Sequence, residues 1–141
     1  MASRAIGFVG RQILSIAVLT LAISAFHTAP AQAEGELVRT ELSRTDLSGS
    51  ATMEVIVARL EMSPGASIPR HFHHGDEHVV VVLGGPVTFA SGKVIEFATG
   101  AALHFPAGEV HGGFTASGEA PLIVYTMHIV EKGKPLVNLV E

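Results

Sequence analysis

The stretch Gly65-Ala-Ser-Ile-Pro-Arg-His71-Phe-His73-His-Gly-Asp-Glu77-His-Val-Val-Val-Val-Leu-Gly84 decides how this chain is read. Side chains alternate between the two faces of a β-strand, so His71 and His73 would point the same way, about 7 Å apart along the chain. Glu77 has the same parity, although the intervening His-Gly-Asp could bend the strand. Two imidazoles and a carboxylate on one face are candidate metal ligands.

A second segment, Gly100-Ala-Ala-Leu-His-Phe-Pro106-Ala-Gly108-Glu-Val-His111, offers a fourth ligand. Pro106-Ala-Gly108 predicts a turn that presents His111 from another strand. Three neutral imidazoles and one carboxylate suit divalent Fe, Mn, Co, Ni, Cu or Zn. Four protein ligands leave positions open on an octahedral ion, and open positions are typical of reactive rather than structural sites.

The first segment resembles the first signature motif of the cupin superfamily. That motif reads Gly, five residues, His-x-His, three or four residues, Glu, six residues, Gly. The positions Gly65, His71, His73, Glu77 and Gly84 satisfy all of it.

The second segment resembles the second cupin motif, which reads Gly, five residues, Pro-x-Gly, two residues, His, three residues, Asn. Gly100, Pro106, Gly108 and His111 match, whereas Thr115 stands where Asn is expected. That departure lies outside the metal ligands.

The resemblance extends from about Leu37 to Ile129. It implies an all-β fold, an antiparallel double-stranded β-helix of the cupin or jelly-roll type. It also implies a metal held by His71, His73, Glu77 and His111. No reaction follows, because cupins include dioxygenases, isomerases, lyases, decarboxylases, sensors and storage proteins.

The N-terminus has the features of a secretory signal peptide, predicted over residues 1–33. Basic residues precede an apolar run, Ile13 to Phe26, and Ala31-Gln-Ala33 predicts cleavage before Glu34. An uncleaved anchor is the alternative, but 14 apolar residues are few for a span of about 20. We therefore expect a periplasmic or secreted protein with no membrane contact after cleavage.

Cleavage leaves residues 34–141, one cupin domain of 108 residues with a formal charge of −6. Its basic residues do not cluster, which disfavours nucleic acid and anionic membranes as partners. The sequence contains no Cys, which excludes disulfides, thiolate metal sites and cysteine nucleophiles. A dense core, a bound metal and dimerisation remain as sources of stability.

Short alternating segments separated by turn residues predict a β-barrel or sandwich without helices. The expected strands are 38–44, 53–62, 68–73, 77–83, 87–90, 93–97, 102–105, 110–114 and 122–130. The run Val79-Val-Val-Val82 predicts burial on both faces of its strand. Because little chain remains to cover a second face, we expect a homodimer. Residues 132–141 are expected to form an edge extension or a tail.

Three residues on the long strands are candidates for substrate binding: Arg59, Tyr125 and Met127. Family counterparts of these positions often line the pocket, and Arg59 could hold a carboxylate through two hydrogen bonds. The alternative for Arg59 is an ordinary exposed strand residue.

Four further histidines are weaker candidates. His74 and His78 have the opposite parity to their ligand neighbours, which favours structural or surface roles. His104 is expected either to face the pocket or to hydrogen-bond backbone near the metal. The parity of His128 on the last strand leaves its face unassigned.

Two functions fit these residues. The first is a small-molecule metalloenzyme of the dioxygenase type, with Fe or Mn favoured over Zn, Ni, Co or Cu. Few acid or base groups remain beyond the ligands, and a dioxygenase needs few. The second is a non-catalytic module that binds a small ligand in a metal-dependent way.

Overall fold

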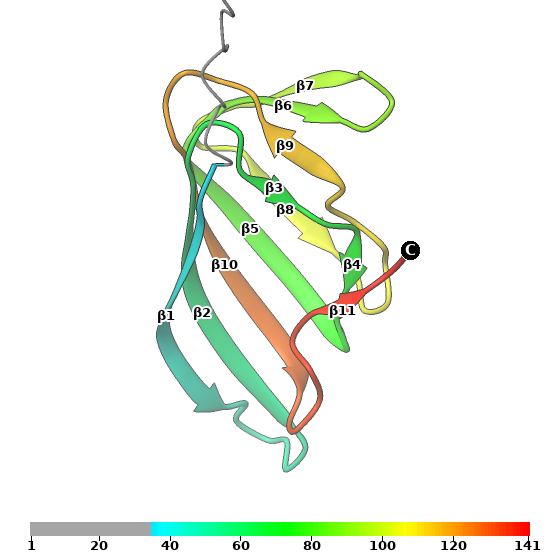
Figure 1. Ribbon diagram of the computed structural model, residues 1–141. Coiled ribbons are helices and arrows are strands. Elements are labelled where there is room, and N and C mark those ends of the chain that lie inside the picture. Colours follow the sequence, from blue (N-terminus) through cyan, green and yellow to red (C-terminus); the bar gives the residue numbers. More distant parts are fainter. Residues whose placement is uncertain (1–34) are drawn as a thin grey trace, which may run out of the picture. The chain divides into compact units, whose positions relative to one another are not determined.

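The computed structural model describes residues 35–141, and every regular element in this range is a β-strand (Figure 1). The expected signal peptide lies outside the described residues and stays a prediction. Within the range described, no helix is long and apolar enough to cross a membrane.

Eleven strands follow one another along residues 35–141. They are β1 (Leu37–Asp46), β2 (Met53–Met62), β3 (Ser67–Ile68), β4 (His71–Phe72), β5 (Gly75–Leu83), β6 (Gly85–Phe89), β7 (Val94–Phe97), β8 (Ala102–Phe105), β9 (Phe114–Ala116), β10 (Leu122–Glu131) and β11 (Asn138–Leu139). Two expected strands, 53–62 and 102–105, agree with β2 and β8 in both bounds.

Other expected strands differ from the observed ones at proline and glycine. The expected strand 68–73 is divided into β3 and β4 at Pro69, which has no N–H to donate to a ladder. The expected strand 110–114 is replaced by β9, because Gly112 and Gly113 turn the chain with φ of 77° and 74°. Only glycine adopts such angles readily.

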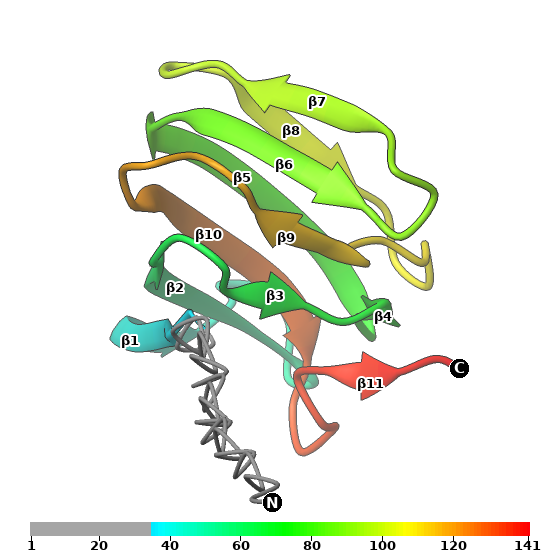
Figure 2. The ribbon, with the colours of Figure 1, turned by 45° about the horizontal axis from the view of Figure 1, so that its top comes forward.

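All strand pairs are antiparallel, and they form two larger sheets and a small one. The strand orders are β1-β2-β10-β5-β8, β3-β9-β6-β7 and β11-β4. Figure 2 shows β3, β9 and β6 lying over β2, β10 and β5. This arrangement confirms the predicted all-β jelly roll.

The core lies between the two larger sheets. Its buried side chains are Met62, Ala66, Val79, Val81, Val87, Ala116, Leu122 and Val124. Strand β10 shows the alternation most clearly, because its even-numbered residues are buried while Tyr125 and Met127 are exposed. Alternation of this kind sets which side chains reach the interior.

The valine run departs from the expectation that both faces of its strand are buried. Val79 and Val81 are 7% and 1% exposed, whereas Val80 and Val82 are 48% and 43% exposed. The expectation is wrong for the single chain, because no second layer of residues 35–141 covers the outer face of β5.

Candidate metal centre

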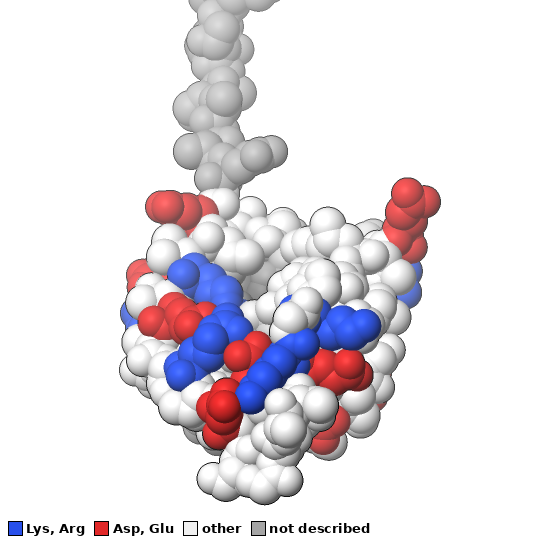
Figure 3. Space-filling model, turned by 90° about the horizontal axis from the view of Figure 1, so that it is seen from below, with Lys and Arg blue, Asp and Glu red and all other residues white. Residues whose placement is uncertain are grey.

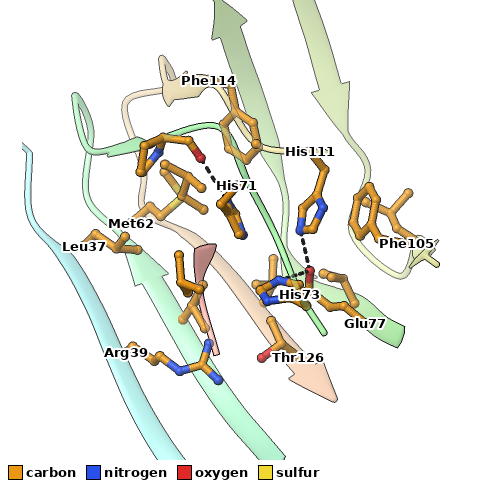
Figure 4. Close-up of a pocket in the computed structure, with 18 of the residues that line it drawn as sticks. Leu37, Arg39, Met62, His71, His73, Glu77, Phe105, His111, Phe114 and Thr126 are labelled. Carbon is orange, nitrogen blue, oxygen red and sulfur yellow. Dashed lines mark hydrogen bonds and ion pairs between the residues drawn. The ribbon is translucent and has the colours of Figure 1, made fainter. Parts of the chain in front are cut away.

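The structure brings the four predicted ligands together at one end of the space between the sheets (Figure 4). His71 belongs to β4, His73 follows it, Glu77 lies in β5 and His111 precedes β9. One nitrogen or oxygen from each lies within 4.8 Å of those of the other three. Their side chains are buried or nearly so.

A reciprocal pair of backbone hydrogen bonds fixes His71 against His111. The N–H of His71 donates to the carbonyl of His111 at 3.0 Å, and the N–H of His111 donates back at 2.9 Å. Gly112 then turns the chain away at once. The two cupin motifs are thereby joined at their histidines.

The outer ring nitrogens of the three histidines are all held by backbone carbonyls. The Nδ1 atoms contact the carbonyl oxygens of neighbouring or distant residues: His71 with Pro69 (2.8 Å), His111 with Glu109 (2.9 Å) and His73 with Leu136. A carbonyl only accepts, so each Nδ1 bears the hydrogen. Each neutral ring then turns an Nε2 lone pair inward, the tautomer that metal-binding histidines use.

These lone pairs meet a carboxylate. The Nε2 atoms of His73 and His111 lie 3.2 Å and 2.8 Å from Oε2 of Glu77. The His111 contact is not aligned as a hydrogen bond, and that Nε2 is buried without a partner. Lone pairs and a carboxylate at this distance repel unless a proton or a cation lies among them. Three imidazole nitrogens and one carboxylate therefore fit a divalent transition metal.

The pKa shifts describe the same groups when protons, and not a cation, lie among them. Burial alone would raise the pKa of Glu77, but the imidazoles of His111 and His73 hold it far below its usual range. Burial lowers the pKa of His71. For His111, burial would lower the pKa, but the Glu77 carboxylate and the Glu109 carbonyl raise it. Glu77 is thus ionised at neutral pH, as a ligand must be.

A fourth imidazole, that of His128 in β10, lies close to Glu77. It is 0% exposed, and its Nε2 is 3.5 Å from Oε1 of Glu77. Its ring meets that of His73 edge-on at 4.5 Å between centroids. Burial lowers the pKa of His128 to about 3, so the ring is neutral at ordinary pH.

The face of His128 was left open by the sequence, although a signal existed. Leu122 and Val124 on the same strand are obvious core residues with the same parity. Counting by twos from them reaches Thr126 and His128, and both are buried and line the pocket.

Arg59, Tyr125 and Met127 do not line this pocket. Tyr125 and Met127 are 41% and 45% exposed on the outer face of the five-stranded sheet. Arg59 lies opposite Tyr125 in the register and pairs with Glu61 at 2.6 Å. The expectation that these three residues line the pocket is wrong. They alternate along β2 and β10 with the residues that face inward, and so face outward themselves. The inward-facing neighbours are Leu60, Val124, Thr126 and His128.

The remaining histidines lie away from the centre. The rings of His78 and His104 stack at 4.5 Å on the exposed face, and His104 Nε2 lies 3.1 Å from Asp76 Oδ2. His78 is a surface residue as expected, whereas His104 does not face the pocket. Asp76 lies within β5. His74 is half-buried beside Phe72.

The metal centre opens into a cavity of about 300 Å³. Its walls are mostly apolar and include Val79 and Phe97. Leu37, Met62 and Phe114 also line it (Figure 4). Phe105 stacks on His111 at 4.2 Å between centroids. Pockets that bind small molecules span roughly 300–1,000 Å³, so this one suits a small ligand.

Two packed antiparallel sheets with a buried His and Glu cluster opening into an apolar cavity define a β-barrel protein with a possible internal metal site. A family model described as "Cupin domain" matches residues 58–130. The match covers slightly more than half of the chain, which therefore belongs to the cupin family. No curated protein sequence matches.

Solved structures share the fold. A cupin domain from Bordetella pertussis Tohama I is 18% identical, with a TM-score of 0.52, over 70% of this chain and 98% of that one. The polyketide cyclase RemF from Streptomyces resistomycificus is 25% identical, with a TM-score of 0.56, over 77% and 74%. A double-stranded β-helix protein from Klebsiella pneumoniae is 22% identical, with a TM-score of 0.55, over 79% and 90%.

Proposed function

We propose that this protein is a metal-dependent enzyme that acts on a small molecule by dioxygenase-type chemistry. The observation that supports it most is the set of inward Nε2 atoms around the ionised Glu77, open to an apolar cavity. His71, His73, Glu77 and His111 would hold the ion, with Fe or Mn favoured and Zn, Ni, Co or Cu compatible with the same donors.

When bound, the metal supplies Lewis acidity and, for Fe or Mn, redox chemistry toward dioxygen. The residues of the chain would position the metal ligands and exclude water. Backbone carbonyls fix the ligand rings, Phe105 packs against His111, and the apolar walls limit water. Among the described residues that line the cavity, the only other imidazole is His128, and its low pKa makes it a poor proton carrier at neutral pH. Such a site favours chemistry that needs no dedicated acid or base.

A non-catalytic, metal-dependent binding module is the second candidate. The same scarcity of acid and base groups supports it, and the cavity lies at the lower end of the size range for ligand pockets. Fold likeness does not decide between the two, although the structural relative RemF is an enzyme.

We further propose export to the periplasm or outside the cell, from the predicted signal peptide, and a small molecule as partner. Figure 3 shows a face on which basic and acidic side chains are intermixed. Opposite charges offset one another within ion pairs such as Arg44 with Glu54 and Lys132 with Asp46. Interleaved charges of this kind do not favour nucleic acid as a partner.

We also propose a homodimer, formed through the outer face of the five-stranded sheet. Val80, Val82, Leu83, Tyr125 and Met127 are between 41% and 48% exposed there. Burying this apolar face against a second copy would stabilise the protein without a disulfide.

Metal analysis of protein purified from its native compartment tests the first proposal, followed by oxygen uptake with phenolic, enol and thiol compounds. We expect about one Fe or Mn per chain and uptake that is lost in His111→Ala. Stoichiometric Zn without any oxygen uptake would support the binding module instead. Absence of any metal would contradict both.

A further inference from the structure

We propose that Arg39 and Thr126 form a subsite that binds the carboxylate of a small, otherwise apolar acid. The inference rests on the proposed function, because it names the class of molecule that would enter the same cavity. It assigns to Arg39 the role that the sequence suggested for Arg59.

Arg39 is the one Lys or Arg among the described residues that line the cavity. It lies on the edge strand β1, opposite Leu60 of β2, and its side chain extends over the interior toward Thr126 (Figure 4). Within the described part of the chain its guanidinium has neither an ion pair nor a hydrogen bond. Arg44 and Arg59, by contrast, pair with nearby glutamates.

Thr126 provides an independent observation on the opposite side of β2. It is 2% exposed, lines the cavity, and its hydroxyl has no hydrogen-bond partner among the described residues. A buried hydroxyl normally has a partner, so one that faces a cavity indicates where a ligand would bind. The β2 residue opposite Thr126 is Ala58, and Arg39 and Thr126 both line the cavity from the strands on either side of β2.

The charges around the cavity also favour an anion. No ion pair joins Arg39 to Glu77, although the Glu77 carboxylate is the charge that acts most strongly on the pKa of Arg39. A bound cation would offset that carboxylate. A loaded site is then positive at both the metal and the guanidinium. A guanidinium can hold a carboxylate through two parallel hydrogen bonds, and the Thr126 hydroxyl can donate a third.

The apolar walls of the cavity favour an apolar body for the ligand, attached to the carboxylate. Leu37 and Met62 face one another across β1 and β2 next to the Arg39–Leu60 pair, and all four line the cavity. Phe97 and Phe114 lie opposite, from the other sheet. A ligand with one carboxylate and an aliphatic or aromatic body satisfies both regions.

Calorimetric titration with 3-phenylpropanoate and its neutral amide tests this, on protein with and without bound metal. We expect the acid to bind at least tenfold more tightly than the amide. In Arg39→Gln the preference should fall below threefold, in Arg39→Lys it should be intermediate, and in Thr126→Val it should be reduced. Arg59→Gln removes an equal charge from the outer face and should leave the preference intact.

The outcomes separate this inference from the proposed function. An Arg39-dependent preference in a protein that takes up no metal would support the subsite and contradict the metalloenzyme. A preference that survives Arg39→Gln but disappears with the metal would show that the ion binds the carboxylate, and would overturn the subsite. No preference in the unaltered protein, or an equal loss in Arg59→Gln, would also overturn it. Circular dichroism and metal content check that each variant is folded. If Arg39→Gln does not fold, Arg39→Lys takes its place in the comparison.

Discussion

The ring of His73 donates its Nδ1 hydrogen to the backbone carbonyl of Leu136, 63 positions further along the chain. This bond joins a predicted metal ligand to the C-terminal segment. Strand β11 supports it, because Asn138 pairs with Phe72 and Leu139 with His71. The tail expected from the sequence is therefore part of the centre.

Shortening the chain tests this role. A protein that ends at Lys134 loses the Leu136 carbonyl, so the His73 ring is free to rotate, and we expect metal affinity to fall by roughly 10–100-fold. A chain that ends at Leu139 keeps both the carbonyl and β11, and its affinity should stay near that of the full protein. Competition with a chromophoric chelator measures both.

Removal of single ligands should lower metal occupancy sharply. We expect this for His71→Ala, His73→Ala and His111→Ala, because each deletes one of four converging donors. His78→Ala changes an exposed ring outside this set and should retain full occupancy. Equal metal content in the His71 and His78 variants, by mass spectrometry of the element, would refute the assignment.

Gly112 is the backbone position at which a methyl group would disturb the centre most directly. A Cβ there would lie 2.5 Å from the Pro69 carbonyl, which accepts the Nδ1 hydrogen of His71. Its φ of 77° adds roughly 1–2 kcal/mol of strain for Ala. We expect Gly112→Ala to lower both stability and metal affinity.

Gly92→Ala is the matched control for that variant. Its φ is 81°, but no atom lies within 4 Å of the added Cβ. Thermal unfolding should show the backbone strain alone in Gly92→Ala and a larger loss of stability in Gly112→Ala, and only Gly112→Ala should lose metal. If both Gly112→Ala and Gly92→Ala kept full metal content, the Pro69 carbonyl would not be needed to orient His71.

The metal-free protein should lose stability as the pH falls from about 6.5 toward 3. The pKa of His128 is about 3 when folded, below its ordinary value of 6.5, so the unfolded chain binds the proton first. The lowered pKa values of His71 and Glu77 act in the same direction. The raised pKa of His111 acts in the opposite one, since its contribution is lost as the pH rises.

Urea unfolding across this pH range measures the effect, which should be on the order of a few kcal/mol for His128. His128→Leu fills a similar buried volume without a titrating group and should flatten the dependence. His78→Leu removes an exposed imidazole and should leave it unchanged. An unaltered slope in His128→Leu would show that other groups dominate.

The proposed dimer should be sensitive to charge on the outer sheet face. Val80 lies opposite Tyr125 and is 48% exposed, so Val80→Glu would place a carboxylate within the apolar face. We expect a shift from dimer to monomer by light scattering at micromolar concentration. Val94→Glu, on β7 of the other sheet and 60% exposed, should leave the dimer intact. A monomeric unaltered protein would refute the proposal.

The sequence predicted the fold class and the convergence of four site residues, because both depend on local spacing and on two motifs. The faces of Arg59, Tyr125 and Met127 follow from strand parity. If Val124 is taken as a core residue, Tyr125 and Met127 face outward, and so does Arg59, which lies opposite Tyr125. Arg39 and Leu136 gave no such signal. They reach the site through edge strands and a long-range backbone bond, and neither is visible as a local pattern.

The reciprocal backbone bonds between His71 and His111 join residues 40 positions apart. An unfolded chain does not hold these two rings together, so the binding site exists only after the sheets have closed. A cation that these residues would hold can therefore be bound only during or after folding, from those present in the same compartment. For a chain that crosses a membrane before it folds, the metal supply of the destination, and not that of the site of synthesis, would determine what the protein contains.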